Sequence, residues 1–207
     1  VIAEKGNLFN APETYMDKLA VSNKIPIDAT DLDFPIEKNI KNIADSLNKD
    51  ISDITACLLD RPRHKKIIDK LNDLNVKIKL ISDGDVSGAL FVTNQKFNVD
   101  IFLGIGGGPE GVLAAGALSC YGGQIQTRLV LTEDEKLRAK KMGILDLKKK
   151  YNIDDMVKGD VIFCATAITD GELANGIKVE KEFFEAQTLA MHKSSNINTL
   201  LKNKHLK

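Results

Sequence analysis

Residues 99–121 read VDIFLGIGGGPEGVLAAGALSCY and are the most informative segment for the fold class. A short apolar run, Val99 to Leu103, is followed by a glycine-rich turn and then by an alanine-rich stretch from Pro109 to Tyr121. A short apolar run before a turn indicates a buried strand, and proline is favoured in the first turn of a helix. The stretch therefore predicts a strand, a tight turn and a helix in direct succession.

The same succession occurs upstream. Apolar runs predict buried strands at residues 54–59 and 76–81, and helical periodicity predicts helices at residues 62–74 and 85–92. A further strand of the same sheet is predicted at residues 160–167. Repeated strand–helix–strand units indicate an α/β fold with a mostly parallel sheet and helices on both faces.

The flanking segments differ in character. Residues 1–10 resemble the end of a strand that leads into a helix around Tyr15, and residues 177–193 contain β-leaning runs without helical periodicity. We expect these segments to form part of a second sheet. Because Val1 is not a start methionine and lies in a strand-like run, we also expect further sequence upstream.

The predicted domain organisation has two parts. Residues 51–171 form a substrate-binding α/β subdomain. The remainder of the chain, residues 1–50 and 172–207, belongs to an N-terminal subdomain that contains the first sheet.

The composition excludes several classes of protein. The chain has 207 residues, of which 43% are apolar and 28% are charged, and its 29 lysines and arginines balance 29 acidic residues. Zero net charge provides no basic field for nucleic acid and no polybasic anchor for a membrane. The three cysteines lie far apart in apolar runs, which predicts buried free thiols, and a cytoplasmic location is the resulting expectation.

Candidate ligand-binding residues follow three of the predicted strands. In an open parallel sheet, ligands bind beyond the carboxyl ends of the strands. The segments at these positions are DRPRH at 60–64, SDGDV at 82–86 and GIGGGPEG at 104–111.

The first of these loops carries two arginines around a proline. Arg61 and Arg63 flank Pro62, which is expected to start a helix. A guanidinium group matches phosphate geometry, and a helix N-terminus adds favourable amide dipoles. Taken alone, the pair is better interpreted as a solvated charge pair, and His64 as a solvated helix residue.

The second loop places two carboxylates around a tight turn. Asp83 and Asp85 flank Gly84, and their oxygens suit sugar hydroxyls or a metal ion. An aspartate before a helix is equally typical of a helix cap. Both interpretations stay open, and one aspartate can serve each purpose.

The third loop gives the strongest signal. The successive glycines Gly106 to Gly108 allow the backbone to approach a ligand closely, and Glu110 follows in the first turn of the helix. The spacing matches neither a Walker A loop nor G-x-G-x-x-G. A binding loop is favoured over a plain turn, although Glu110 also suits the helix dipole.

Taken together, these segments resemble the class II fructose-1,6-bisphosphatase family. Their order and spacing agree with the later two-thirds of such a protein across nearly the whole chain. The segments that carry the resemblance are KG at 5–6, NAPETYMDKL at 10–19, RPRH at 61–64, SDGDV at 82–86, GIGGGPEGVLAA at 104–115, MGI at 142–144 and VIFCATAITDG at 161–171.

The resemblance implies a phosphatase that depends on Mn²⁺ or Mg²⁺ and hydrolyses the 1-phosphate of fructose 1,6-bisphosphate. It also implies the layered fold of the lithium-sensitive sugar phosphatases and a homo-oligomer. Glu110 falls on the position of a metal-ligand glutamate. The positions that match substrate-binding residues of the family are Tyr15, Arg61, Pro62, Arg63, Asp83, Gly84, Asp85 and Gly107.

The chain departs from the family pattern in one major respect. The Asp-Pro-x-Asp/Glu-Gly-Thr motif, which supplies metal ligands and a catalytic threonine in such proteins, has no counterpart in this sequence. We therefore assign no catalytic residue and expect the chain to be inactive alone. One alternative is a non-catalytic sugar-phosphate-binding fragment, because one acidic ligand cannot hold two divalent ions. The other is a sedoheptulose-1,7-bisphosphatase, because these loops do not distinguish a six-carbon from a seven-carbon sugar. Smaller departures from the family are Arg61, where lysine is common, and Gly108, where alanine is common.

Overall fold

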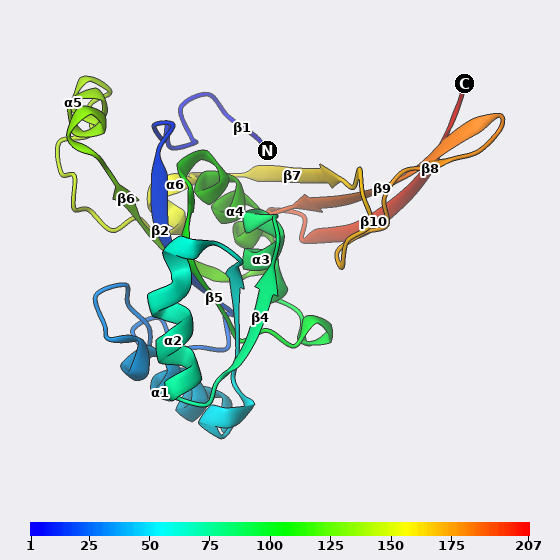
Figure 1. Cartoon of the computed structure of the whole chain (residues 1–207). Coiled ribbons are helices and arrows are strands. Elements are labelled where there is room, and N and C mark those ends of the chain that lie inside the picture. The colour runs from blue at the N-terminus through cyan, green and yellow to red at the C-terminus, as the bar shows by residue number, and fades with distance from the viewer.

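The computed structural model describes residues 1–207, which form two sheets and the helices around them (Figure 1). The central sheet has the strand order β4-β3-β5-β2-β6, and the second sheet has the order β1-β7-β9-β10, with β8 paired to β9. An α/β fold with part of a second sheet is therefore confirmed. The strands of the central sheet are β2 (Tyr15–Val21), β3 (Thr55–Leu59), β4 (Lys77–Ile81), β5 (Ile101–Gly107) and β6 (Gln124–Val130). Those of the second sheet are β1 (Ile2–Ala3), β7 (Val161–Thr166), β8 (Lys178–Val179), β9 (Phe183–His192) and β10 (Ile197–Leu206).

The helices lie on both faces of the central sheet. Their bounds are α1 (Ile36–Leu47), α2 (Lys65–Asp73), α3 (Asp85–Phe91), α4 (Gly108–Tyr121), α5 (Glu133–Lys141) and α6 (Ile153–Met156), and short 3-10 turns cover Ile51–Asp53, Pro62–His64 and Gln95–Phe97. None of the helices combines the length and the apolarity needed to span a bilayer.

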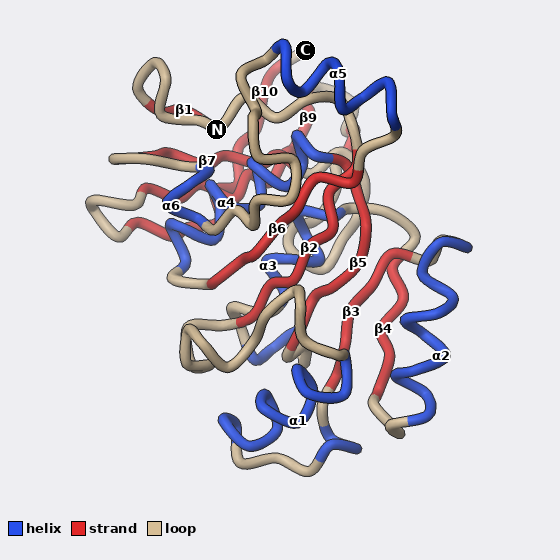
Figure 2. The backbone as a smooth tube through the Cα atoms, turned by 90° about the vertical axis from the view of Figure 1, so that its left-hand side faces the viewer, coloured by secondary structure: helices blue, strands red, loops and turns tan.

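Strand alternation sends the apolar side chains of the central sheet into two cores. Leu58 and Ile101 point toward α1 and α2, whereas Cys57 and Phe102 point toward α3 and α4. Figure 2 shows the five strands side by side, with α2 next to β4. The predicted strands at 54–59, 76–81 and 99–103 and the three predicted helices are confirmed.

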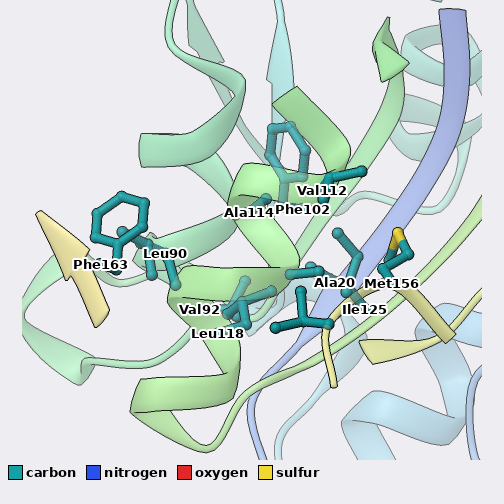
Figure 3. Close-up of a cluster of buried hydrophobic side chains, with 14 of the residues drawn as sticks. Ala20, Leu90, Val92, Phe102, Val112, Ala114, Leu118, Ile125, Met156 and Phe163 are labelled. Carbon is teal, nitrogen blue, oxygen red and sulfur yellow. The ribbon is translucent and has the colours of Figure 1, made fainter. Parts of the chain in front are cut away.

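Helix α4 lies between the two sheets. Most of its residues are buried, because its small side chains allow close packing on both sides. Figure 3 shows Phe102 of β5, Leu118 of α4 and Phe163 of β7 in one apolar cluster. This shared core joins the second sheet to the central one.

The prediction of a mostly parallel sheet is wrong, because only β3 forms parallel pairs, with β4 and β5. One predicted helix and the sheet assigned to one predicted strand are also wrong. The segment around Tyr15 is not a helix but strand β2, which pairs antiparallel with both β5 and β6. The strand predicted at 160–167 exists as β7, but it pairs antiparallel with β1 and β9 in the second sheet. Both outcomes depend on strand pairing between segments that are distant in the sequence. The local sequence pattern contains no information about such pairing. Each strand pairs with strands that were assigned to the other predicted subdomain. The division into subdomains at residues 50 and 171 stays a prediction.

The prediction for the cysteines is correct for two of the three. Cys57 and Cys120 are buried free thiols, but Cys164 is exposed. Residue Cys164 alternates with Phe163 along β7, so its side chain points away from α4 and the shared core.

Candidate functional site

The loops that follow β3, β4 and β5 lie at one edge of the central sheet. These strands are parallel, so their carboxyl ends meet at that edge. The backbone N–H of Asp60 donates to the carbonyl of Ile81 at 2.8 Å, which joins the first two loops. Because β2 runs the other way, its first residue, Tyr15, lies opposite Gly107. The residues predicted to bind substrate all lie in these loops or at the start of β2.

Arg63 is held by two contacts. Its Nε donates to the carbonyl of Ile105 at 2.8 Å, and its guanidinium carbon lies 4.9 Å from the centre of the Tyr15 ring. The first contact ties the side chain to β5, and the second is a cation–π interaction with β2. Arg63 remains exposed, so its terminal nitrogens are accessible to a ligand.

Arg61 is less constrained. Its Nη1 donates to the carbonyl of the preceding Asp60 at 2.8 Å, and no other side chain fixes it. Pro62 begins the 3-10 turn that leads into α2, as its fixed backbone angle favours. The two arginines thus leave the same short loop, but only Arg63 is linked to the glycine-rich turn.

The interpretation of His64 as a solvated residue is wrong. Its side chain is 1% exposed. The backbone N–H of Ile105 donates to Nε2 at 2.8 Å, and Nδ1 lies 2.7 Å from the carbonyl of Leu59. A neutral imidazole with its proton on Nδ1 satisfies both contacts. His64 therefore fixes the arginine loop to β3 and β5.

The Asp83–Asp85 turn does not work as a helix cap. Gly84 adopts φ 93° and precedes α3, but no side chain caps the helix. Asp83 is exposed and accepts only the N–H of Gly84, at 2.9 Å. Asp85 is buried and forms an ion pair with Lys18 of β2. The helix-cap interpretation is therefore wrong for both aspartates.

Lys18 is a buried residue of this site that the sequence interpretation missed. It is 1% exposed and its ammonium donates to Oδ2 of Asp85. Burial lowers the pKa of the Lys18 ammonium, and the charge of Asp85 opposes that shift. The sequence contains one indication of this burial: in a strand, Lys18 shares a face with the apolar residues Met16 and Ala20. Because this segment was predicted as a helix, that alternation was not recognised.

The glycine-rich turn makes room for two carboxylates of the protein itself. A Cβ on Gly106 would lie 1.8 Å from Oδ2 of Asp85, and a Cβ on Gly107 would lie 1.9 Å from Oε2 of Glu110. A Cβ at Gly106 would have to displace the buried carboxylate of Asp85, whereas the exposed side chain of Glu110 can turn away from a Cβ at Gly107. The turn therefore places both carboxylates against the backbone between β5 and α4, and only Asp85 is confined there.

A cleft of about 720 Å³ opens beside the loop that follows β4. Residues 80–84 line one wall, and residues 165–174, from the end of β7 and the loop after it, line the other. Asp170, on the second wall, accepts the N–H of Gly176 at 2.8 Å. The cleft thus lies between a loop of the central sheet and a loop of the second sheet.

The sequence model of the bacterial, glpX-encoded fructose-1,6-bisphosphatases matches residues 1–205. The chain belongs to this family. The class II resemblance inferred from the motifs is thereby confirmed.

Curated members of the fructose-1,6-bisphosphatase family align along most or all of the chain. The D-fructose 1,6-bisphosphatase class 2/sedoheptulose 1,7-bisphosphatase of Synechococcus sp. (strain JA-2-3B'a(2-13)) is 35% identical over 220 residues, which cover 100% of this chain and 63% of that protein. The fructose-1,6-bisphosphatase 2 class 2 of Escherichia coli (strain K12) is 35% identical over 202 residues, which cover 90% of this chain and 62% of that protein. The chain thus spans less than two thirds of the length of these relatives.

The residues present do not form a complete metal site for a class II bisphosphatase. Glu110 is exposed in the first turn of α4, and no group of three or more His, Cys, Asp or Glu side chains is placed to hold a metal ion. The carboxylate of Asp85 is already paired with Lys18. Mg²⁺ sites combine one or two carboxylates with phosphates and waters. Glu110 therefore supplies a single carboxylate ligand of such a site.

Proposed function

We propose that this chain is the sugar-bisphosphate-binding part of a phosphatase that hydrolyses the 1-phosphate of fructose 1,6-bisphosphate. The observation that carries the proposal is the gathering of Tyr15, Arg63 and Gly107 at one edge of the central sheet. These residues come from separate segments and match substrate positions of the family.

The arginine loop suits the phosphate that is not cleaved. Arg63 is preorganised by Tyr15 and Ile105, so a phosphate would order it at little further cost in side-chain entropy. The N-terminus of α4 adds backbone N–H groups and a partial positive charge close by. Asp83 and Asp85 carry the acceptor oxygens that sugar hydroxyls require.

The metal part of the proposal is limited to Glu110. We propose that Glu110 contributes one carboxylate to a Mn²⁺ or Mg²⁺ site. Because the chain's other residues do not complete that site, we assign no hydrolytic step to this chain and expect it to be inactive alone. The order of helices, sheet, helices and second sheet supports, as a further proposal, the layered fold of the lithium-sensitive phosphatases. A homo-oligomer is likewise proposed.

The names of two relatives favour sedoheptulose 1,7-bisphosphate as a second candidate substrate. The Synechococcus relative, and one from Synechocystis sp. (strain ATCC 27184 / PCC 6803 / Kazusa) that is 33% identical over 220 residues, carry the names of both a fructose and a sedoheptulose bisphosphatase. We therefore include sedoheptulose 1,7-bisphosphate as an alternative substrate.

Calorimetry and a phosphate-release assay test the proposal together. The 207-residue chain is titrated with fructose 1,6-bisphosphate, sedoheptulose 1,7-bisphosphate and, as a control without phosphate, fructose. We expect saturable binding of one or both bisphosphates, no binding of fructose and no phosphate release with Mn²⁺. Absence of bisphosphate binding would contradict the binding role, and sustained turnover would contradict the claim of inactivity.

A further inference from the structure

Lys18 occupies an unusual place for a charged side chain. It lies on β2 opposite Gly104 of β5, and its alternation with Met16 directs it toward α4. A Cβ added to Gly111, in the first turns of α4, would lie 3.4 Å from Cε of Lys18. The ammonium therefore lies beneath the glycine-rich turn, beside the first residue of α3.

The surroundings of Lys18 oppose its positive charge. An ammonium group has three donors, yet Asp85 is its only acceptor in the structure. Burial is the main effect that lowers the pKa of Lys18, and Arg63 adds to it, whereas the charges of Asp85 and Glu110 favour the ammonium. Replacing a buried ion pair by apolar residues is often neutral or stabilising, so stability alone accounts poorly for this pair.

The ion pair with Lys18 occupies one of the two carboxylate oxygens of Asp85. Oδ2 is bonded to Lys18 and is the carboxylate oxygen nearest to Gly106, and no protein group donates to Oδ1. Asp85 as a whole is 8% exposed, and Lys18 is 1% exposed. A ligand at the glycine-rich turn can therefore reach Asp85 but not Lys18.

We propose that Lys18 is a positioning residue, which holds the carboxylate of Asp85 in the one orientation that leaves Oδ1 free to accept a hydroxyl of a sugar phosphate. This inference rests on the proposed function, because it assumes that Asp85 binds the sugar-phosphate substrate. Lys18 does not touch the ligand. Without it, the carboxylate would turn toward the free N–H groups at the start of α3.

The experiment measures ligand affinity by calorimetry on the 207-residue chain and four variants. These are Lys18→Met, Asp85→Asn, the double variant and the control Lys77→Met. Lys77 forms an ion pair with Asp53 at 2.7 Å, but it is 56% exposed and lies at the other end of the sheet. The probes are fructose 1,6-bisphosphate and inorganic phosphate.

We expect Lys18→Met to weaken fructose 1,6-bisphosphate binding about tenfold, which equals about 1.4 kcal/mol, with phosphate binding unchanged because the arginines hold it. The control variant should bind like the wild type. In the double variant, affinity should equal that of Asp85→Asn, because Lys18 acts only through Asp85. This last comparison holds even if Lys18→Met alone does not fold.

A thermal melt separates positioning from structure. Lys18→Met leaves a buried carboxylate without a partner and should lower Tm, whereas the double variant removes both charges and should recover it. Recovery of Tm without recovery of bisphosphate binding supports positioning, and recovery of both indicates a structural pair and overturns the inference.

Two binding results separate this inference from the proposed function. Unchanged bisphosphate affinity in Lys18→Met, or weaker binding in the double variant than in Asp85→Asn, overturns the role of Lys18 alone. A wild-type chain that binds no sugar bisphosphate contradicts the proposed function and, with it, the task assigned to Asp85.

Discussion

The guanidinium carbon of Arg63 lies 4.9 Å from the centre of the Tyr15 ring, and this contact links two segments that are distant in the sequence. Arg63 follows β3, whereas Tyr15 begins β2. With its bond to Ile105, Arg63 also contacts β5 just before the glycine-rich turn. One side chain thus fixes the relative positions of three segments of the candidate site.

Arg63→Ala should weaken fructose 1,6-bisphosphate binding by about 1.5–3 kcal/mol, the scale of a charge-assisted hydrogen bond. Arg63→Lys keeps the charge but loses the planar guanidinium, so its affinity should fall between those of the wild type and the alanine variant. Calorimetry on the three proteins measures both differences. An alanine variant with wild-type affinity would remove Arg63 from the phosphate site.

Glu110→Gln keeps the size of the side chain and removes its charge. In an active form of the enzyme assayed with Mn²⁺, we expect kcat to fall by a factor of about 100 or more, which corresponds to about 2.7 kcal/mol of transition-state stabilisation. The Mn²⁺ concentration for half-maximal rate should rise at the same time. If rate and metal dependence stay normal, Glu110 serves only the dipole of α4.

Gly106→Ala should destabilise the fold and displace Asp85, because the new Cβ would lie 1.8 Å from Oδ2 of that carboxylate. Overpacking of this kind typically costs about 1–3 kcal/mol of unfolding free energy. Gly171→Ala is the matched control, since its Cβ would meet only the carbonyl of Ala174 at 3.8 Å. Urea unfolding of both variants compares the two costs. Equal urea midpoints for the two variants would show that the glycine-rich turn can accommodate a Cβ at residue 106.

Asp160 should make the turn between β9 and β10 sensitive to acid. Hydrogen bonds from the Ser194 hydroxyl at 2.8 Å, from His192 at 2.7 Å and from the Ser194 N–H lower the pKa of Asp160 from 3.8 to about 2. A carboxyl whose pKa is depressed on folding stabilises the folded state above its ordinary pKa, and that contribution is lost as pH falls toward about 2.

The test is the Ser194 amide resonance, followed by NMR from pH 6 to pH 2. We expect it to move as Asp160 is protonated, mostly below pH 3.8, and to be insensitive to pH in Asp160→Asn. A wild-type resonance that does not move below pH 3.8 would show that protonation of Asp160 does not affect this turn.

Cys164 should be the only thiol that reacts with iodoacetamide in the folded chain at pH 8. It is exposed, whereas burial raises the pKa of the Cys57 thiol to about 12 and also raises the pKa of Cys120. Mass spectrometry should find one fast label, and none in Cys164→Ser. Rapid labelling of Cys57 would mean that the core opens on the timescale of the reaction.

Local sequence pattern was enough to predict the strand–turn–helix units and the loops that carry the candidate ligand residues. The strands β3 and β5 are short apolar runs, and α4 begins at the last glycine of a run with a proline next to it, so local pattern was sufficient to predict them. The order of the family motifs placed Arg63 and Glu110 without reference to any contact. Parallel topology then implied one common edge.

The contacts that hold these residues in place depend on the folded chain. Lys18 and Asp85 are separated by 67 residues, and nothing local to either one specifies the pair. The assignment of β2 as a strand depended on β5 and β6 on either side of it, and the burial of His64 depended on backbone groups of Leu59 and Ile105. Propensity and periodicity describe neighbours along the chain, whereas ion pairs, strand order and burial are set by segments that meet only when the chain is folded.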